Sequence, residues 1–178
     1  LVLVAQGKES AECIEALREM NACSKVAIVT ETHANLYHLG FVSCIDRTIE
    51  SFINSDAEVD YIPDLFITVG SNVISKKIKS LFRRHKKIIA DHWHFGDEVM
   101  DTFQSLTKLI KAEANPILSY LSGSLESNAS QFGNSWRARF FEMEQRHIEF
   151  LKTSAYSDLK VFEIINDFIP DQTSVQMG

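Results

Sequence analysis

The chain has 178 residues, of which 45% are hydrophobic and 24% are charged, and its formal net charge is −6 at pH 7. This size and composition suit one medium-sized domain, or one domain with part of another, and provide enough apolar residues for a normal core. The net negative charge argues against general nucleic-acid binding, because an acidic chain gains little from counterion release. No apolar run reaches the roughly 18–20 residues that a membrane-spanning helix needs.

The three cysteines, Cys13, Cys23 and Cys44, occur without a Cys-x-x-Cys pair and without histidines at metal-site spacing. An odd number of such cysteines is typical of reduced thiols, so we expect a cytoplasmic protein. The chain starts with Leu-Val-Leu-Val, without an initiator methionine or the architecture of a signal peptide. We interpret it as a piece of a longer polypeptide.

The first 60 residues alternate short apolar runs with amphipathic segments. Residues 1–5 and 25–30 are apolar and predict two buried strands. Between them, apolar residues at helical spacing predict a helix over residues 10–22. A polar loop is expected over residues 31–40, and a short helix over residues 48–53.

Residues 63–93 predict a strand, a glycine turn, a helix and a second strand. The first strand covers residues 65–69 and ends at Gly70, and the second covers residues 87–91. Ser71 and Asn72 are suitable capping residues for the helix between the strands. In such a βαβ unit, the glycine turn before the helix N-terminus is a common place for an anion to bind.

Two lysines, Lys76 and Lys77, fall in the expected first turn of this helix. A cation is disfavoured there by roughly 0.3–1 kcal/mol, because the helix dipole is positive at its N-terminus. One interpretation is a lysine face in contact with water. The other is that both amines point over the strand ends towards an anion. The residues leave both interpretations open, and Lys76 and Lys77 are the candidate substrate-binding residues.

The second half of the sequence is more helical. Apolar spacing predicts a helix over residues 97–112, and residues 115–135 are rich in Ser, Gly and Asn, as is typical of a linker or a loosely packed edge. Further helices are expected over residues 136–152 and 158–168, the latter capped by Asp158. Residues 173–178 look like the start of another strand.

Short apolar strands that alternate with helices predict an α/β fold, in which helices cover both faces of a parallel sheet. We expect a three-layer, Rossmann-like domain over residues 1–114, a linker over 115–135, and the helical start of a truncated C-terminal domain over 136–178. No Gly-x-Gly-x-x-Gly follows any predicted strand, so a dinucleotide site is not expected.

Other groupings of reactive residues are weak. His92 and His94 would share one face of a strand, as a metal-binding pair might, but no third ligand stands at a recognisable spacing. Ser122-Gly123-Ser124 lies in the expected linker and not between a strand and a helix, as a catalytic serine elbow would. The residues therefore predict neither a metal site nor a catalytic centre.

The serial order of elements resembles the central domain of thiamine-diphosphate-dependent enzymes, and among them the 2-succinyl-5-enolpyruvyl-6-hydroxy-3-cyclohexene-1-carboxylate synthase family. Residues 64–70 followed by Ser75-Lys76-Lys77 are similar to the family's strand, glycine and basic helix start. Residues 31–36 are similar to a loop with an acidic residue, although Glu31 replaces the more usual Asp. Trp136 and residues 161–170 and 175–178 resemble the opening of the third domain.

This resemblance implies a three-domain synthase of menaquinone biosynthesis that decarboxylates 2-oxoglutarate on thiamine diphosphate, anchored through Mg²⁺, and adds the succinyl-semialdehyde unit to isochorismate. The cofactor performs the difficult chemistry. The family's activating glutamate and metal motif lie in the first and third domains, so no catalytic residue is assigned here. The chain alone is expected to be inactive and to hold no cofactor.

The resemblance also implies partners. These are the missing N- and C-terminal domains, the two anionic small-molecule substrates near Lys76 and Lys77, and further copies of the parent enzyme in a dimer or tetramer. Two alternatives stay open: the central domain of another thiamine-diphosphate enzyme, similar to acetolactate synthase, that binds a nucleotide, and a stand-alone regulatory domain that binds a small molecule.

Overall fold

The computed structural model describes residues 1–7, 10–38, 40–125 and 130–175. It divides into two compact units, Leu1–Phe141 and Glu142–Gly178, and each is described by itself. Within the described ranges, none of the helices combines the length and the apolar content that crossing a membrane requires.

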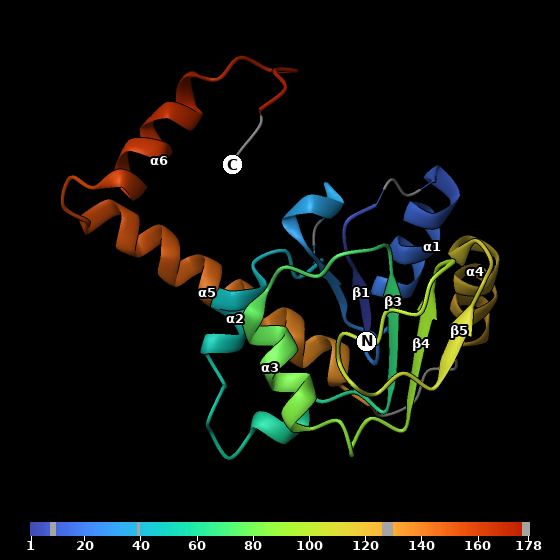
Figure 1. Ribbon diagram of the computed structural model, residues 1–178. Helices are drawn as coiled ribbons and strands as arrows, with labels where there is room; N and C mark the ends of the chain where they lie inside the picture. Colours follow the sequence, from blue (N-terminus) through green and yellow to red (C-terminus); the bar gives the residue numbers. More distant parts are fainter. Residues whose placement is uncertain (8–9, 39, 126–129, 176–178) are drawn as a thin grey trace. The chain divides into compact units, whose positions relative to one another are not determined.

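A five-stranded parallel sheet forms the centre of the first unit, with the strand order β2-β1-β3-β4-β5 (Figure 1). Strand β1 pairs with β2 on one side and β3 on the other, so that Leu3 lies opposite both Val29 and Thr68. The predicted α/β fold with a parallel sheet is therefore confirmed. The strands are β1 (Val2–Val4), β2 (Ile28–Thr30), β3 (Leu65–Val69), β4 (Asp91–Phe95) and β5 (Lys108–Ile110).

Helices lie on both faces of this sheet (Figure 1). Helices α1 (Ala11–Asn21) and α4 (Ala114–Ser124) pack against each other on one face. Helices α2 (Ile45–Glu50) and α3 (Lys76–Arg84), with the first turns of α5 (Phe132–Thr153), cover the other face. Two short 3-10 helices, η1 (Thr32–Ala34) and η2 (Glu58–Tyr61), lie in the connections.

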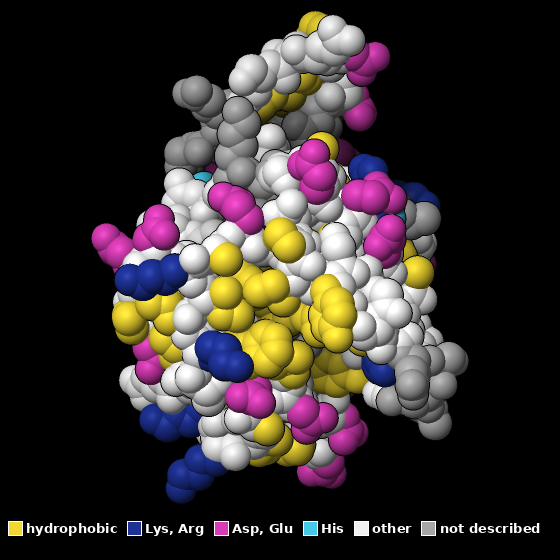
Figure 2. Space-filling view, turned by 90° about the vertical axis from the view of Figure 1, so that its right-hand side faces the viewer, with side chains coloured by type: hydrophobic (Ala, Val, Ile, Leu, Met, Phe, Trp, Pro, Cys, Tyr) yellow, Lys and Arg dark blue, Asp and Glu magenta, His cyan; other side chains and the backbone are white. Residues whose placement is uncertain are grey.

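The face that carries α1 and α4 leaves some apolar side chains at the surface, where they gather in a patch (Figure 2). The partly buried residues packed against this core include Trp93 and Ile110 of the sheet and Ile117 of α4. The Lys108 ammonium group lies 4.9 Å from the centre of the Trp93 ring, in a cation–π contact. The patch follows from the position of β5 at the edge of the sheet.

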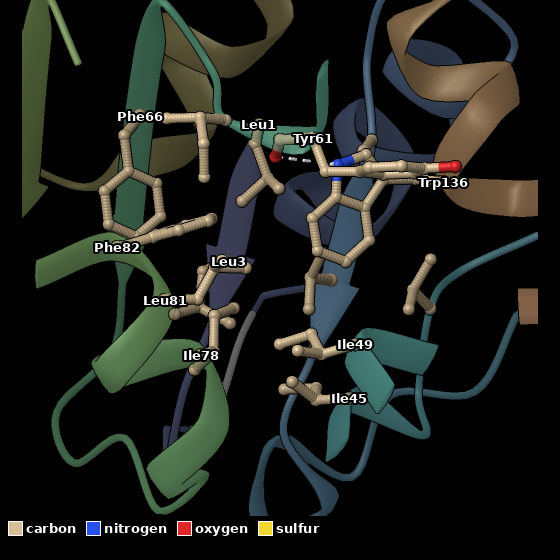
Figure 3. Packing of buried hydrophobic residues seen from close by; sticks show 14 of the residues in the cluster. Leu1, Leu3, Ile45, Ile49, Tyr61, Phe66, Ile78, Leu81, Phe82 and Trp136 are labelled. Carbon is tan, nitrogen blue, oxygen red and sulfur yellow. Dashed lines mark hydrogen bonds between the residues drawn. The ribbon is translucent and has the colours of Figure 1, made fainter. Parts of the chain in front are cut away.

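The apolar runs of the sequence are explained by burial of both faces of the sheet. Side chains alternate along a strand, so Leu1 and Leu3 face α2 and α3 while Val2 and Val4 face α1 and α4. Figure 3 shows the first of these clusters. In it the Trp136 ring meets Tyr61 edge-on, with ring centres 5.7 Å apart, and its Nε1 donates to the Tyr61 carbonyl oxygen (3.3 Å).

The fourth strand begins four residues later than predicted. Helix α3 runs to Arg84, and the backbone N–H groups of Ala90 and Asp91 both donate to the Asp64 carbonyl oxygen (2.9 and 3.0 Å). Pairing with β3 therefore starts only at Asp91, and Ile88, expected in the strand, is 41% exposed. The strand itself is the segment Asp-His-Trp-His-Phe, whose two histidines are buried.

The predicted helix over residues 97–112 is wrong. A loop occupies most of this segment, and β5 occupies its end. The Asp101 carboxylate accepts the backbone N–H groups of Ser105 (2.9 Å) and Leu106 (3.0 Å), and Gln104 adopts a left-handed conformation with φ of 58°. An aspartate that takes backbone donors in this way competes with helix formation.

Residues 115–135, expected to be irregular, instead contain most of α4. Leu118 is fully buried against α1, and the hydroxyl groups of Ser122 and Ser124 donate to carbonyl oxygens of their own helix. Serines whose hydroxyl groups bond within a helix are compatible with that helix. The serine content of residues 115–135 was therefore a poor guide to whether the segment is irregular. The boundaries predicted for the domains stay predictions.

The remaining helices are close to expectation. Helix α1 is capped by the Ser10 hydroxyl, α2 starts three residues before the predicted helix, and α5 starts four residues before Trp136. In the second unit, α6 (Asp158–Phe168) has the predicted bounds, but its cap is Ser157 and not Asp158. Residues 173–175 form no strand, and residues 176–178 lie outside the described residues.

Candidate functional site

The carboxyl ends of the strands form the first place to look for a site. The chain leaves β1 for α1 on one face of the sheet and leaves β3 for α3 on the other. Such a reversal between neighbouring strands creates the crevice in which open α/β sheets bind ligands. Gln6, Glu31 and Gly70 follow β1, β2 and β3 at this edge.

The chain closes this crevice with its own backbone. Ser71 donates to the Gln6 carbonyl oxygen through its backbone N–H (2.7 Å) and its hydroxyl (3.0 Å), and the Gln6 N–H donates to the Asn72 carbonyl oxygen (3.4 Å). Gly70 has φ of +85°, and a Cβ there would lie 2.7 Å from the same Gln6 oxygen. The Ser71 N–H group at this crevice is thus already bonded to the Gln6 carbonyl oxygen.

The N-terminus of α3 already holds an anion, which is the carboxylate of Glu31. Its Oε1 accepts the backbone N–H groups of Ile74 and Ser75, both at 2.9 Å, and the Glu31 side chain is buried. Ser75 caps the helix, since its hydroxyl accepts the N–H of Ile78 (3.2 Å) and donates to the Asp46 carboxylate. The cap is therefore Ser75 and not the Ser71 or Asn72 expected from the sequence.

The two candidate lysines differ in their surroundings. Lys77 forms an ion pair with Glu50 of α2, in which both side chains are partly exposed. Lys76 directly follows the cap, is exposed, and has no hydrogen-bond or ion-pair partner among the described residues. The structure places both in the first turn of α3, as predicted, but only Lys76 presents an uncommitted amine.

A buried cluster of neutral polar groups lies on the α3 side of β3 and β4. The Thr68 hydroxyl is 3.1 Å from His92 Nε2 and 2.9 Å from His94 Nδ1, so the two histidines share a face as predicted. His92 Nδ1 also contacts the Ser105 hydroxyl (3.1 Å). Burial lowers the pKa of His92 to about 4 and lowers the pKa of His94.

These histidines do not form a metal centre with other residues. Within the described ranges, no three side chains of His, Cys, Asp or Glu come together as a metal ion would require. The Thr68 hydroxyl, which both imidazoles contact, makes the cluster a hydrogen-bonded part of the core.

The opposite end of the sheet carries a cleft that the sequence did not indicate. It has a volume of about 770 Å³ and lies at the amino ends of β1 and β3, between the start of α5 and the end of α4. Leu1, Leu65, Leu121 and Phe132 are among its mostly apolar lining residues. Its walls come from segments distant in sequence, so periodicity and spacing contain no signal for it.

Comparison with known proteins finds relatives that share one name. No family model matches the chain. Proteins named 2-succinyl-5-enolpyruvyl-6-hydroxy-3-cyclohexene-1-carboxylate synthase are similar to it, from Flavobacterium johnsoniae (29% identical over 86% of this chain), Flavobacterium psychrophilum (30% over 87%) and Christiangramia forsetii (26% over 100%).

The chain spans 27%, 28% and 31% of the length of these three curated relatives, respectively. It therefore corresponds to a segment of a larger protein of that kind. The resemblance predicted from the order of its elements is confirmed: this chain is related to the 2-succinyl-5-enolpyruvyl-6-hydroxy-3-cyclohexene-1-carboxylate synthases.

Proposed function

We propose that the chain is the central domain of a synthase in menaquinone biosynthesis, which decarboxylates 2-oxoglutarate on thiamine diphosphate and adds the succinyl-semialdehyde unit to isochorismate. The observation that carries the proposal is the similarity over 86–100% of the chain to synthases of that printed name. The closed crevice between β1 and β3 supports it, since a central domain in this role needs no nucleotide of its own.

The described residues of this chain do not fit thiamine diphosphate or Mg²⁺. They contain no cluster of three metal-ligating side chains, and the backbone N–H groups of Ile74 and Ser75, just before α3, are already bound to Glu31. The cofactor and its metal ion would therefore be held by the other domains of the parent protein. The domain described here would contribute to the substrate side of the site.

Lys76 and Lys77 are the proposed substrate-binding residues, with different tasks. Both substrates of the proposed reaction carry carboxylates, and an ammonium group is a suitable partner for them. Lys76, exposed and without a partner among the described residues, would contact a substrate carboxylate directly. Lys77 would support it by tying α3 to α2 through Glu50.

The direct test is the substitution Lys76→Ala in the full-length synthase that contains this chain. We expect KM for one carboxylate substrate to rise by about 10- to 100-fold, the size expected for the loss of one hydrogen bond to a charged group. Lys76→Arg should retain part of the affinity. The matched control is Lys87→Ala, an exposed lysine beyond the other end of α3. Unchanged KM values for both substrates in Lys76→Ala would contradict the role of Lys76.

Nucleotide binding separates this proposal from the acetolactate-synthase-like alternative. Titration of FAD, NAD or ADP onto the chain should give no micromolar binding, because the N–H and hydroxyl donors of Ser71 already bond to the Gln6 carbonyl oxygen. Micromolar binding of any of these nucleotides would contradict the proposal.

A further inference from the structure

The start of α3 has the construction of an anion-binding site whose anion belongs to the chain. Glu31 directly follows β2, and its carboxylate bonds to the amides of two residues that lie 43 and 44 positions further along. The residue is 7% exposed, so these two hydrogen bonds replace the hydration of the carboxylate. A negative charge at a helix N-terminus is stabilised by the helix dipole and by the free N–H groups.

We infer that Glu31 is a positioning residue for Lys76. This inference rests on the proposed function, in which Lys76 contacts a substrate carboxylate. Glu31 fixes the backbone of Ile74 and Ser75, and Lys76 is the next residue in the chain. The backbone before Lys76 is thereby held by a residue that follows β2, and the exposed Lys76 side chain extends from this fixed point.

The arrangement also decides how a substrate carboxylate can bind at α3. The N–H groups of Ile74 and Ser75 are bound to Glu31, and the N–H of Ile78 is bound to the Ser75 hydroxyl. These three N–H groups are therefore not open to an incoming carboxylate, which would meet the Lys76 ammonium group instead. Without Glu31 these amides would attract the anion themselves and compete with Lys76.

Chemical rescue tests the filled anion site in the chain itself. Glu31→Ala leaves a space the size of a carboxylate beside two unpaired N–H groups, and we expect Tm to fall by roughly 5–15 °C. Formate in excess should enter the space and restore part of the loss, whereas chloride at the same ionic strength should restore less. Glu31→Gln keeps the shape and an oxygen acceptor, so its Tm should fall less and should not respond to formate.

The matched control is Glu149→Ala, which removes an exposed glutamate on α5 and should show no formate effect. Failure of formate to raise the Tm of Glu31→Ala above that of its chloride control would overturn the inference.

The positioning role is tested in the full-length synthase by combining substitutions. Glu31→Ala should raise KM for the same substrate as Lys76→Ala does, with a smaller change in kcat, and formate should lower that KM again. The double variant should have a KM no higher than that of Lys76→Ala, because Glu31 acts through Lys76. Residues that act independently would give multiplied effects on KM.

The outcomes separate the inference from the proposed function. If Lys76→Ala changes no KM value, both the role of Lys76 and the positioning role of Glu31 are wrong. If Lys76→Ala raises KM but the double variant multiplies the two effects, the role of Lys76 stands and the positioning role is overturned.

Discussion

At the carboxyl ends of the strands, polar groups of the chain satisfy one another, whereas at the amino ends an apolar cleft of about 770 Å³ lies among the described residues. The carboxyl end is the one at which α/β sheets usually bind ligands. Here the Gln6 carbonyl oxygen accepts a bond from Ser71, and the Glu31 carboxylate accepts a bond from Ile74. The cleft at the other end is lined mostly by apolar residues, with Lys25 and Gln131 among its few donors.

In this Rossmann-like sheet, backbone groups at the crevice are already bonded within the chain. The strand order and the reversal between β1 and β3 are those of a binding fold. Binding also requires unpaired backbone groups, and the N–H groups of Ser71, Ile74 and Ser75 are already engaged by Gln6 and Glu31. Function must therefore be argued from the contacts at the site, because the same fold can support several different functions.

The largest expected effect on the free energy of unfolding concerns Gly133, in the first turn of α5 near the amino ends of the strands. A Cβ at this position would overlap the backbone of Val26, which precedes β2. Gly133→Ala should force α5 away from the sheet and lower the free energy of unfolding by about 3 kcal/mol or more. Urea unfolding of the chain measures this change.

The control for Gly133 is Gly123→Ala in α4, where no atom lies within 4 Å of the added Cβ. Alanine is the better helix former, so this variant should gain up to about 1 kcal/mol. Equal losses in the two variants would show that α5 does not approach β2 as described.

The second effect tests the closed carboxyl end. Gly70→Ala places a Cβ 2.7 Å from the Gln6 carbonyl oxygen at φ of +85°, and should cost about 2–3 kcal/mol of unfolding free energy. Ser71→Ala removes only the hydroxyl donor to Gln6 and should cost less than about 1.5 kcal/mol. A loss in Gly70→Ala no greater than that in Ser71→Ala would argue against the tight contact between β1 and β3.

The third effect is a pH dependence of stability that comes from the buried histidines. The pKa of His92 is about 4 in the folded chain and near its ordinary value of 6.5 in the unfolded chain. Between these values the unfolded chain binds the proton and the folded chain does not. The free energy of unfolding should therefore fall as pH drops from about 6.5 to about 4, by at most about 1.4 kcal/mol per pH unit for this residue.

His94 acts in the same direction, because burial also lowers its pKa. Thermal melting against pH should show a shallower slope in His92→Gln than in the parent chain, and an unchanged slope in the control His33→Gln, which alters an exposed histidine. An unchanged slope in His92→Gln would mean that other groups carry the acid sensitivity.

The smallest effect concerns the pair Lys77–Glu50. Both side chains are partly exposed, at 39% and 61%, so water and salt screen the attraction. Lys77→Ala should cost less than about 1 kcal/mol of unfolding free energy, and the loss should shrink at high salt. A loss larger than that of Gly70→Ala would make this pair, and not the backbone contacts, the main support of the carboxyl end.

The elements that could be predicted from the sequence are those whose residues repeat a local pattern. The amphipathic spacing of α1, α3 and α6 was sufficient for these helices, and the apolar runs were sufficient for β1, β2 and β3. The strand β4 was placed too early because the apolar run Ile88-Ile89-Ala90 precedes it. The true strand carries two polar residues, His92 and His94, which are buried beside Thr68 of the neighbouring strand. The short strand β5 was missed because an apolar spacing over residues 97–112 resembled a helix.

The candidate site was predictable only in part. A βαβ unit with a basic helix start was visible, and Lys76 and Lys77 do lie in the first turn of α3. The difference between them depends on Glu50, which is 27 positions away from Lys77. The role of Glu31 depends on contacts 43 and 44 positions away, and its one local signal is an acidic residue directly after a buried strand.

The bond between Ser71 and Gln6 also has a consequence for the order of folding. The units β1-α1-β2 and β3-α3-β4 are each formed by contiguous segments, whereas Ser71 and Gln6 are 65 positions apart. Contacts between distant residues form slowly, because the chain must first lose the entropy of the intervening loop. We expect the two halves of the sheet to form separately and then to dock along this line, so the contacts that close the ligand crevice are also the last step of assembly.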